Sequence, residues 1–162
     1  MKYDLFVSVI IPVFNNSGGL KICLQVLEIQ SYPKSLYEII VVDNGSVENI
    51  KFLVSQFPQT SFTNEPQPGS YAARNKGISI ARGEIIAFTD SDCIPALNWL
   101  EVGVQHLLSV PKCGLVAGRI EIFFKNPNHP TAVEIYDRIT YLKQNKYIEK
   151  YKFGATANLF TF

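Results

Sequence analysis

The sequence contains few cysteines, and their pattern argues against two classes of small protein. Its three cysteines, Cys23, Cys93 and Cys113, are odd in number, stand in apolar surroundings and lack Cys-x-x-Cys spacing. Neither a disulfide framework nor a cysteine-ligated zinc site is expected from such an arrangement. A reducing compartment fits this cysteine usage best, so we expect a cytoplasmic location.

Long apolar runs and a large net charge are also missing. No segment approaches the ~18 uninterrupted apolar residues that a membrane-spanning helix needs, so we expect a soluble chain. Asp4 and Pro12 interrupt the apolar run near the N-terminus, and no small-residue cleavage site follows it, which indicates a strand and not a signal peptide. A net charge of +1 provides no basic footprint, so no nucleic-acid partner is predicted.

Two familiar phosphate-binding loops are absent from the sequence as well. No G-x-G-x-x-G follows the first apolar run, and no G-x-x-x-x-G-K-[ST] occurs anywhere, so neither dinucleotide nor P-loop chemistry has its usual cradle. What is present is ordinary for a globular protein: 162 residues, 47% of them hydrophobic and 18% charged. One domain of about 150 residues buries roughly 68 to 70% of its unfolded surface, which is enough for a sound core.

The centre of the chain, ARGEIIAFTDSDCIP from Ala81 to Pro95, places two carboxylates directly after an apolar run. Glu84–Phe88 is typical of a strand buried on both faces of a parallel sheet, and Asp90 and Asp92 follow its carboxyl end. Open α/β sheets bind ligands in the crevice outside their strand ends. An Asp-x-Asp pair there offers hard oxygen ligands to Mg²⁺ or Mn²⁺ on a diphosphate. The alternative is structural: an Asx-turn at Asp90 and a helix start at Asp92.

Strands and helices alternate along the rest of the chain, which predicts a parallel sheet built from βαβ units. Other strands are expected at Phe6–Ile11, Tyr37–Val42, Thr60–Thr63, Gly114–Phe124 and the terminal GATANLFTF. Pro12 should stop the first of these, and Asp43 directly follows the second. Five helices are expected: one capped by Ser17, one near 47–57, one capped by Ser70 and ending at Gly83, and two more over Leu97–Ser109 and Thr131–Leu142. The first should bury a stripe formed by Leu20, Cys23, Leu24 and Leu27. The fourth should bury a stripe formed by Leu97, Leu100, Val104, Leu107 and Leu108.

The stretch from Arg138 to Lys152 is rich in basic and aromatic residues. It holds Arg138, Lys143, Lys146, Lys150 and Lys152 against Glu149, with Tyr141, Tyr147 and Tyr151 between them. Such a stretch could meet anionic lipid or a phosphorylated acceptor, so contact with a membrane surface stays open. A solvated basic face is the alternative. The apolar end of the chain at Phe162 leads us to expect that the fold is cut short at its C-terminus.

Four segments together resemble the nucleotide-sugar-binding half of family 2 glycosyltransferases. They are VSVIIPVFNN at Val7–Asn16, IIVVDNGS at Ile39–Ser46, GSYAARNKGISIARGEIIAFTDSD at Gly69–Asp92 and, more loosely, GATANLF at Gly154–Phe160. The resemblance implies a GT-A fold: an open, mainly parallel α/β sheet of Rossmann type with helices on both faces. It also implies a single domain over residues 1–162 without its acceptor half, and an inverting transfer of a sugar from a nucleoside diphosphate donor with the help of Mg²⁺ or Mn²⁺.

The same resemblance implies roles for particular residues. Pro12, Val13 and Phe14 match the loop against the nucleobase, Asp43 the carboxylate that accepts a base N–H, and Arg74 the residue that reaches the nucleotide. Asp90 matches the carboxylate on the ribose and metal side, and Asp92 the direct metal ligand. A fixed cation there would stabilise the departing diphosphate.

A departure from the family concerns the general base. The family places that acidic residue after the Gly-Ala-Asn-Leu-like stretch, and Glu121 and Glu134 match nothing in the motif. We therefore expect nucleotide-sugar binding without sugar transfer from these 162 residues. The leading hypothesis is a UDP-sugar transferase for a glycan or lipid-linked acceptor in surface polysaccharide or glycolipid synthesis. The alternatives are a non-catalytic nucleotide-sugar-binding module and a nucleotidyltransferase, against which the missing phosphate loop argues.

Overall fold

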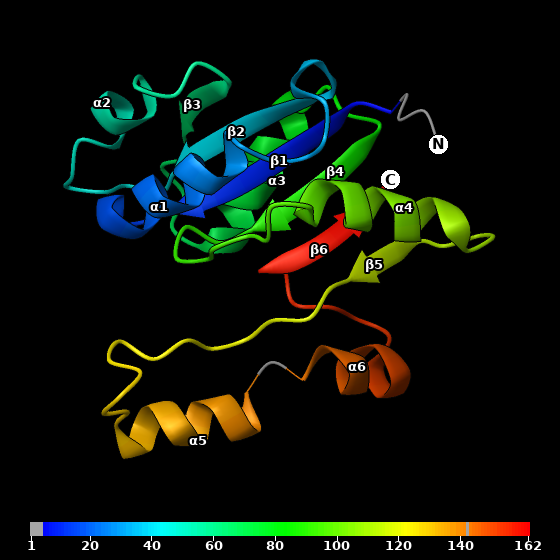
Figure 1. The fold of residues 1–162 in the computed structure, drawn as a ribbon. Coiled ribbons are helices and arrows are strands. Elements are labelled where there is room, and N and C mark those ends of the chain that lie inside the picture. Colours follow the sequence, from blue (N-terminus) through cyan, green and yellow to red (C-terminus); the bar gives the residue numbers. More distant parts are fainter. Residues whose placement is uncertain (1–4, 142) are drawn as a thin grey trace.

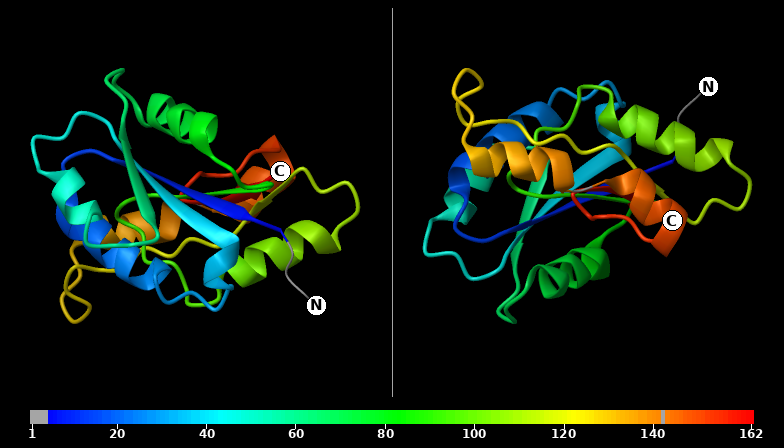
Figure 2. Two further views of the ribbon diagram at one scale, coloured as in Figure 1. Left: turned by 90° about the horizontal axis from the view of Figure 1, so that it is seen from above. Right: turned by 90° about the horizontal axis from the view of Figure 1, so that it is seen from below.

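The computed structural model describes residues 5–141 and 143–162 and contains a six-stranded mixed sheet covered by helices on both faces (Figures 1 and 2). The strands are β1 (Val7–Val13), β2 (Tyr37–Asp43), β3 (Thr60–Asn64), β4 (Ile85–Thr89), β5 (Leu115–Ala117) and β6 (Asn158–Thr161). Their order across the sheet is β3-β2-β1-β4-β6-β5. The first four run parallel, while β6 is antiparallel to both β4 and β5. The predicted open, mainly parallel α/β sheet is confirmed.

Strand β1 lies at the centre of the sheet, and all seven of its residues are buried. Its odd-numbered side chains join the larger core on one face of the sheet, whereas Ile10 joins the smaller core on the opposite face. The prediction that Pro12 stops this strand is wrong, because β1 continues to Val13. The Val13 carbonyl accepts from the Asn44 N–H on the β2 side, so the nitrogen of Pro12 faces the β4 side, where pairing has already ended at Ile10. The N–H that proline lacks would have no strand partner on that side, so Pro12 does not destabilise the sheet.

Helices α1 (Ser17–Leu27) and α4 (Trp99–Ser109) cover one face of the sheet (Figure 2). The buried stripe predicted for α1 is confirmed, but its cap is the Asn16 side chain and not Ser17. In α4 the residues Leu100, Val104 and Leu107 are buried as predicted. Leu97 and Leu108, which the predicted stripe included, are 57% and 52% exposed. The helix begins only at Trp99, so Leu97 precedes it.

Helix α3 (Ser70–Ile80) covers the opposite face, where its Ala73 packs with Ile10 (Figure 2). Gly69, with φ +120°, occupies the N-cap position in place of the predicted Ser70, and a backbone of that kind favours glycine. The helix ends at Ile80, so the prediction that Gly83 caps it is wrong. Gly83 instead lies so close to the backbone nitrogen of Ser8 that a Cβ atom would collide with it.

The remaining elements are short. They are η1 (Lys34–Leu36), α2 (Ile50–Val54), α5 (Ala132–Thr140), α6 (Gln144–Lys146) and the π-helical turn η2 (Tyr147–Tyr151). The helix predicted near 47–57 is thus shorter, because Asn49 caps it. Of the stretch predicted as a strand at Gly114–Phe124, only β5 pairs with the sheet. The predicted end of the helix after Thr131, at Leu142, lies outside the described residues. None of the described helices combines the length and apolar character needed to cross a membrane.

Candidate functional site

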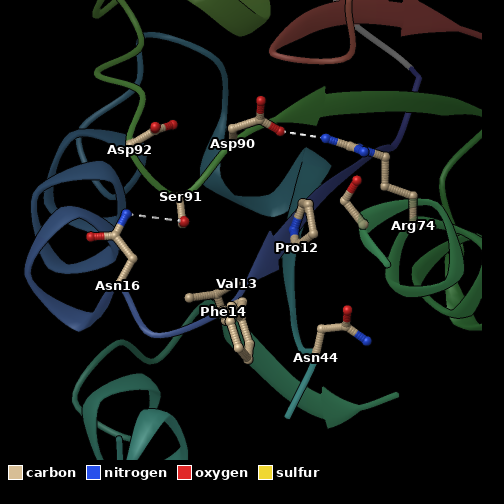
Figure 3. A pocket seen from close by; sticks show the side chains of 10 residues that line it. Pro12, Val13, Phe14, Asn16, Asn44, Arg74, Asp90, Ser91 and Asp92 are labelled. Carbon is tan, nitrogen blue, oxygen red and sulfur yellow. Dashed lines mark hydrogen bonds and ion pairs between the residues drawn. The ribbon is translucent and has the colours of Figure 1, made fainter. Parts of the chain in front are cut away.

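The carboxyl ends of β1, β2 and β4 meet at one edge of the sheet around a cavity of about 340 Å³ (Figure 3). Its lining residues are Pro12, Val13, Phe14, Asn16, Asn44, Ser70, Arg74, Asp90, Ser91 and Asp92. Six of the seven residues predicted for the nucleotide-sugar and metal site are therefore brought together, and Asp43 alone is left out. This is the place where open α/β sheets bind ligands.

Asp90 and Arg74 form an ion pair across the cavity. The Arg74 guanidinium donates to Asp90 Oδ1 at 2.5 Å, with side chains that are 15% and 35% exposed. The Nε atom of Arg74 is buried and has no hydrogen-bond partner among the described residues. Arg74 reaches this position because its helix packs on the sheet face beside β1 and β2. An anionic ligand placed here meets a cation that is already fixed by a carboxylate.

Asp92 differs from Asp90 because its carboxylate is exposed to solvent. Its one hydrogen-bond contact within the described residues is a weak one, with the Cys93 thiol at 3.9 Å from Oδ1. No group of three or more His, Cys, Asp or Glu side chains suited to a metal ion occurs in residues 5–141 and 143–162. The donor set therefore suits Mg²⁺ or Mn²⁺ only in the mode where one or two carboxylates hold the ion and ligand phosphates complete its shell.

Asn16 and Ser91 line the cavity although sequence reasoning did not select them. Asn16 Oδ1 accepts from the Gly19 N–H at 3.2 Å, and its Nδ2 donates to Ser91 Oγ at 3.3 Å (Figure 3). A Cβ on Gly19 would come within 2.9 Å of the Ser91 carbonyl. The start of α1 is thus held against the loop that carries both aspartates. The signal in the sequence was the Asn-Asn pair before Ser17, since Asn is a strong N-cap residue.

Asp43 is not among the residues that line the cavity and instead makes a local turn. Its Oδ1 accepts from the Ser46 N–H at 3.0 Å, which is the turn role that its sequence context also allowed. The neighbouring Asn44 lines the cavity in its place. Asn44 donates to the carbonyls of Glu65 and Gln67, both at 2.8 Å, and accepts from the Gly69 N–H at 2.7 Å. Asn44 therefore ties the loop before α3 to the end of β2.

The apolar side of the cavity is formed by the end of β1 (Figure 3). Pro12 and Val13 are buried, whereas Phe14 is 63% exposed. The next residue, Asn15, has φ +49°; its N–H donates to Ser46 Oγ at 2.9 Å, and its Oδ1 accepts from the Val47 N–H at 2.8 Å. This fixed turn presents an exposed aromatic ring on which a flat heterocycle can stack.

Two thiols lie near the aspartate loop, and both are held in the neutral form. Burial raises the pKa of Cys23 well above its ordinary value, and the charges of Cys93, Asp92 and Asp90 add to this effect. Burial likewise raises the pKa of Cys93. Burial therefore favours the neutral, poorly nucleophilic thiol at both positions.

A second cavity, of about 620 Å³, lies between residues 117–122 and residues 138–141 and 143–149. Its lining includes side chains of both charges, and Glu121 pairs with Arg119 at 2.6 Å. Glu134 lies in the capping box of α5, where it accepts from Thr131 and Lys125. These two glutamates, which match nothing in the motif, thus have structural partners.

Comparison with known proteins places the chain among sugar transferases. The family model described as glycosyl transferase family 2 matches residues 8–160. The glycosyltransferase AglE of Haloferax volcanii is 45% identical over 161 residues, which are 96% of this chain and 52% of that protein. The UDP-Glc:alpha-D-GlcNAc-diphosphoundecaprenol beta-1,3-glucosyltransferase WfgD of Escherichia coli is 32% identical over 126 residues, 76% of this chain and 49% of that protein.

Among solved structures, the fold is similar to the mannosyltransferase PcManGT of Pyrobaculum calidifontis in complex with GDP-Man and Mn²⁺. The TM-score is 0.74 at 22% identity, over 99% of this chain and 45% of that one. The resemblance in fold agrees with the GT-A architecture expected from the sequence. The chain spans about half the length of the curated relatives AglE and WfgD.

Proposed function

Since the chain belongs to glycosyl transferase family 2, we propose that it binds a nucleoside diphosphate sugar, preferably a UDP-sugar, in the cavity at the strand ends. The observation that carries this proposal is the meeting of an exposed ring, a fixed guanidinium and two carboxylates at Phe14, Arg74, Asp90 and Asp92. In this proposal residues 1–162 form the nucleotide-sugar-binding part of one transferase domain. WfgD, whose name specifies UDP-Glc, supports the choice of uridine.

The nucleobase is proposed to lie against Pro12, Val13 and Phe14. Asp43 stays in the proposal as acceptor for the ring N–H of uracil, since in the described structure only its Oδ1 is engaged, by Ser46. This role requires the Asp43 side chain to turn toward the cavity. Asn44 already lines the cavity, but both of its amide N–H groups donate to the Glu65 and Gln67 carbonyls, so only its Oδ1 keeps a lone pair with which to accept from the base or ribose.

The diphosphate is proposed to lie between Arg74 and the two aspartates. Asp92 would ligate a divalent cation directly, with Asp90 beside it on the ribose side. When bound, that cation supplies positive charge where the leaving diphosphate gains negative charge. Arg74 orients the diphosphate and adds a second fixed positive charge. The Mn²⁺ in the PcManGT complex supports a metal-assisted donor site.

The acceptor hydroxyl needs a general base for an inverting transfer, worth about 10²- to 10⁴-fold in rate. Asp90 and Asp92 are the only acids that line the cavity in the described residues, and both are assigned to the donor side. We therefore propose that residues 1–162 bind the donor and hydrolyse it slowly, without transfer. The acceptor of the whole protein is proposed to be a glycan or a lipid-linked glycan, as the name of WfgD supports. We propose that the whole protein acts in the cytoplasm, in the synthesis of a surface polysaccharide or glycolipid.

Calorimetric titration with UDP and Mn²⁺, combined with an assay of UDP release from UDP-sugars, tests this function. Metal-dependent binding with slow release that an acceptor does not stimulate is the expected result. Acceptor-stimulated release by the 162-residue chain would show that a base exists among its own residues. Release of pyrophosphate from UTP would instead favour the nucleotidyltransferase, and binding with no release at all would favour the non-catalytic module.

A further inference from the structure

Helix α5 (Ala132–Thr140) turns its apolar side chains away from the protein. Val133, Ile135, Tyr136 and Ile139 are 68%, 42%, 66% and 61% exposed, and none of the nine residues of the helix is buried. At about 100° per residue these four side chains share one face of the helix. A surface helix normally buries such a face, so α5 has the reverse orientation of an ordinary amphipathic helix.

Polar contacts on the other face hold α5 in this orientation. Glu134 accepts from the Lys125 N–H at 2.8 Å and from the Thr131 N–H at 2.7 Å. The Arg138 guanidinium lies 5.1 Å from the centroid of the Phe124 ring. The contacts with Lys125 and Phe124 run to the extended segment that lies between α5 and the sheet (Figure 1), whereas the contact with Thr131 is the capping box of α5 itself. The exposed apolar face is therefore a consequence of specific inward contacts and not of a loosely placed helix.

The sequence on both sides of α5 is rich in basic and aromatic residues. Residues 118–153 contain seven basic side chains against four acidic ones, a net charge of +3 in a chain whose total is +1. The basic residues are Arg119, Lys125, Arg138, Lys143, Lys146, Lys150 and Lys152, and the acidic residues are Glu121, Glu134, Asp137 and Glu149. Exposed aromatic rings accompany them: Phe123, Tyr141, Tyr151 and Phe153 are 64%, 61%, 55% and 50% exposed.

We propose that α5 and residues 141–153, excluding the undescribed residue 142, form a docking surface for an anionic lipid bilayer. Helix α5, α6 and η2 lie together on the outer side of the molecule, away from the sheet (Figures 1 and 2). Short amphipathic helices with basic flanks bind bilayers by inserting apolar side chains at the headgroup boundary, and exposed aromatic rings favour that boundary. The basic residues add attraction to anionic lipid.

Charge also distinguishes this occupant from a second copy of the chain. The docking surface holds five basic and three acidic residues, so a symmetric dimer through α5 would bring two patches of net charge +2 together, which costs energy unless the interface is large. Four apolar side chains on a nine-residue helix offer much less than the ~800 Å² per partner of a standard protein interface. An anionic bilayer removes the same apolar surface from water and neutralises the same charges. The docking surface does not depend on the proposed transferase activity.

Co-sedimentation of the 162-residue chain with vesicles tests the docking surface. Vesicles of phosphatidylcholine with phosphatidylglycerol should bind the protein, and vesicles of phosphatidylcholine alone should bind it much less. The variant Ile135→Ser/Ile139→Ser should reduce binding at least tenfold. The matched control Ile78→Ser/Ile80→Ser, on α3, removes isoleucines that are 45% and 41% exposed and should leave binding unchanged.

A charge variant tests the contribution of the basic residues to bilayer binding without altering the apolar face of α5. Lys146→Gln/Lys150→Gln should weaken binding on the order of fivefold for each lysine, and added salt should weaken the binding of the parent chain. The control Lys21→Gln/Lys51→Gln, on α1 and α2, should bind as the parent does.

Three outcomes would overturn the docking surface: no binding to anionic vesicles, equal losses in the variants and their controls, or a dimer in light scattering that Ile135→Ser/Ile139→Ser dissociates. Calorimetry with UDP separates this inference from the proposed function. A chain that binds anionic vesicles through α5 but does not bind UDP would refute only the function.

Discussion

The contrast between Asp92 and Asp90 yields a prediction about metal binding that can be separated from stability. Asp92 is exposed and has only a weak contact with a thiol at 3.9 Å, so Asp92→Asn should change the free energy of unfolding by no more than about 0.5 kcal/mol. The same substitution removes a full charge from the proposed cation site. A unit-charge pair at ~4 Å and an effective dielectric near 20 is worth about 4 kcal/mol before desolvation.

Even if desolvation offsets two thirds of that energy, roughly 1.4 kcal/mol remains, which corresponds to about tenfold in affinity. We therefore expect at least a tenfold loss of Mn²⁺-dependent UDP affinity in Asp92→Asn. Asp90→Asn should lose affinity as well, but it should also destabilise the fold by about 1 to 2 kcal/mol, because it leaves the part-buried Arg74 without its carboxylate.

Titration calorimetry with UDP and Mn²⁺, and urea unfolding without ligand, measure the two effects separately. Asp92→Glu provides a control that keeps the charge and should keep more affinity than Asp92→Asn. Unchanged affinity in Asp92→Asn would remove Asp92 from the metal site. A large loss of stability in the same variant would mean that the Asp92 carboxylate contributes to the fold and is not free for a metal.

Four further predictions address other parts of the molecule. UDP should bind better than CDP, and Asp43→Ala should abolish this preference; equal binding of the two nucleotides by the parent chain would leave Asp43 as a turn residue only. Phe14→Ala should weaken UDP binding by about 1 to 3 kcal/mol without changing the unfolding midpoint, since its ring is 63% exposed. Asn44→Ala removes three hydrogen bonds and should lower the free energy of unfolding by about 2 to 3 kcal/mol in urea titrations. Burial raises the pKa of Tyr37 to about 12, so its neutral phenol, bonded to the Leu27 carbonyl, stabilises the fold fully below pH ~10 and loses that contribution as the pH rises toward 12. The stability advantage of the parent over Tyr37→Phe should therefore shrink over that interval in thermal melts, and a constant difference would contradict the assignment.

The elements that could be predicted from sequence are those whose signal is local. The apolar run of β1 and the stripe of α1 follow from composition and period, and the position of Asp90 follows from the rule that strand ends share an edge. The role of Asp43 was harder to predict, because the pleat decides it. Val41 packs on the α1 side and Val42 on the α3 side, so successive side chains at the end of β2 alternate in direction. Asn44, and not Asp43, is the one that lines the cavity.

Contacts between distant residues were beyond prediction from one sequence. The Arg74–Asp90 pair joins residues 16 apart, and the Asn16–Ser91 contact joins residues 75 apart. Helix orientation was also undetermined by periodicity. The pattern of α5 shows two distinct faces but does not say which one meets the protein, and here the polar face meets it because Glu134 and Arg138 have partners in the segment that precedes the helix.

The insertion of β6 between β4 and β5 has a consequence for the order of folding during synthesis. β6 comes from residues 158–161, yet within residues 5–141 and 143–162 it is the one strand that pairs with β5. Until these residues leave the ribosome, the edge of β4 stays unpaired and the space beside Trp99 and Gly103, later filled by the Phe160 ring, stays open. An unpaired edge strand is a site for aggregation, and pairing between strands so far apart in sequence is slow. The nascent chain is therefore at greatest risk of aggregation at this edge just before β6 is made.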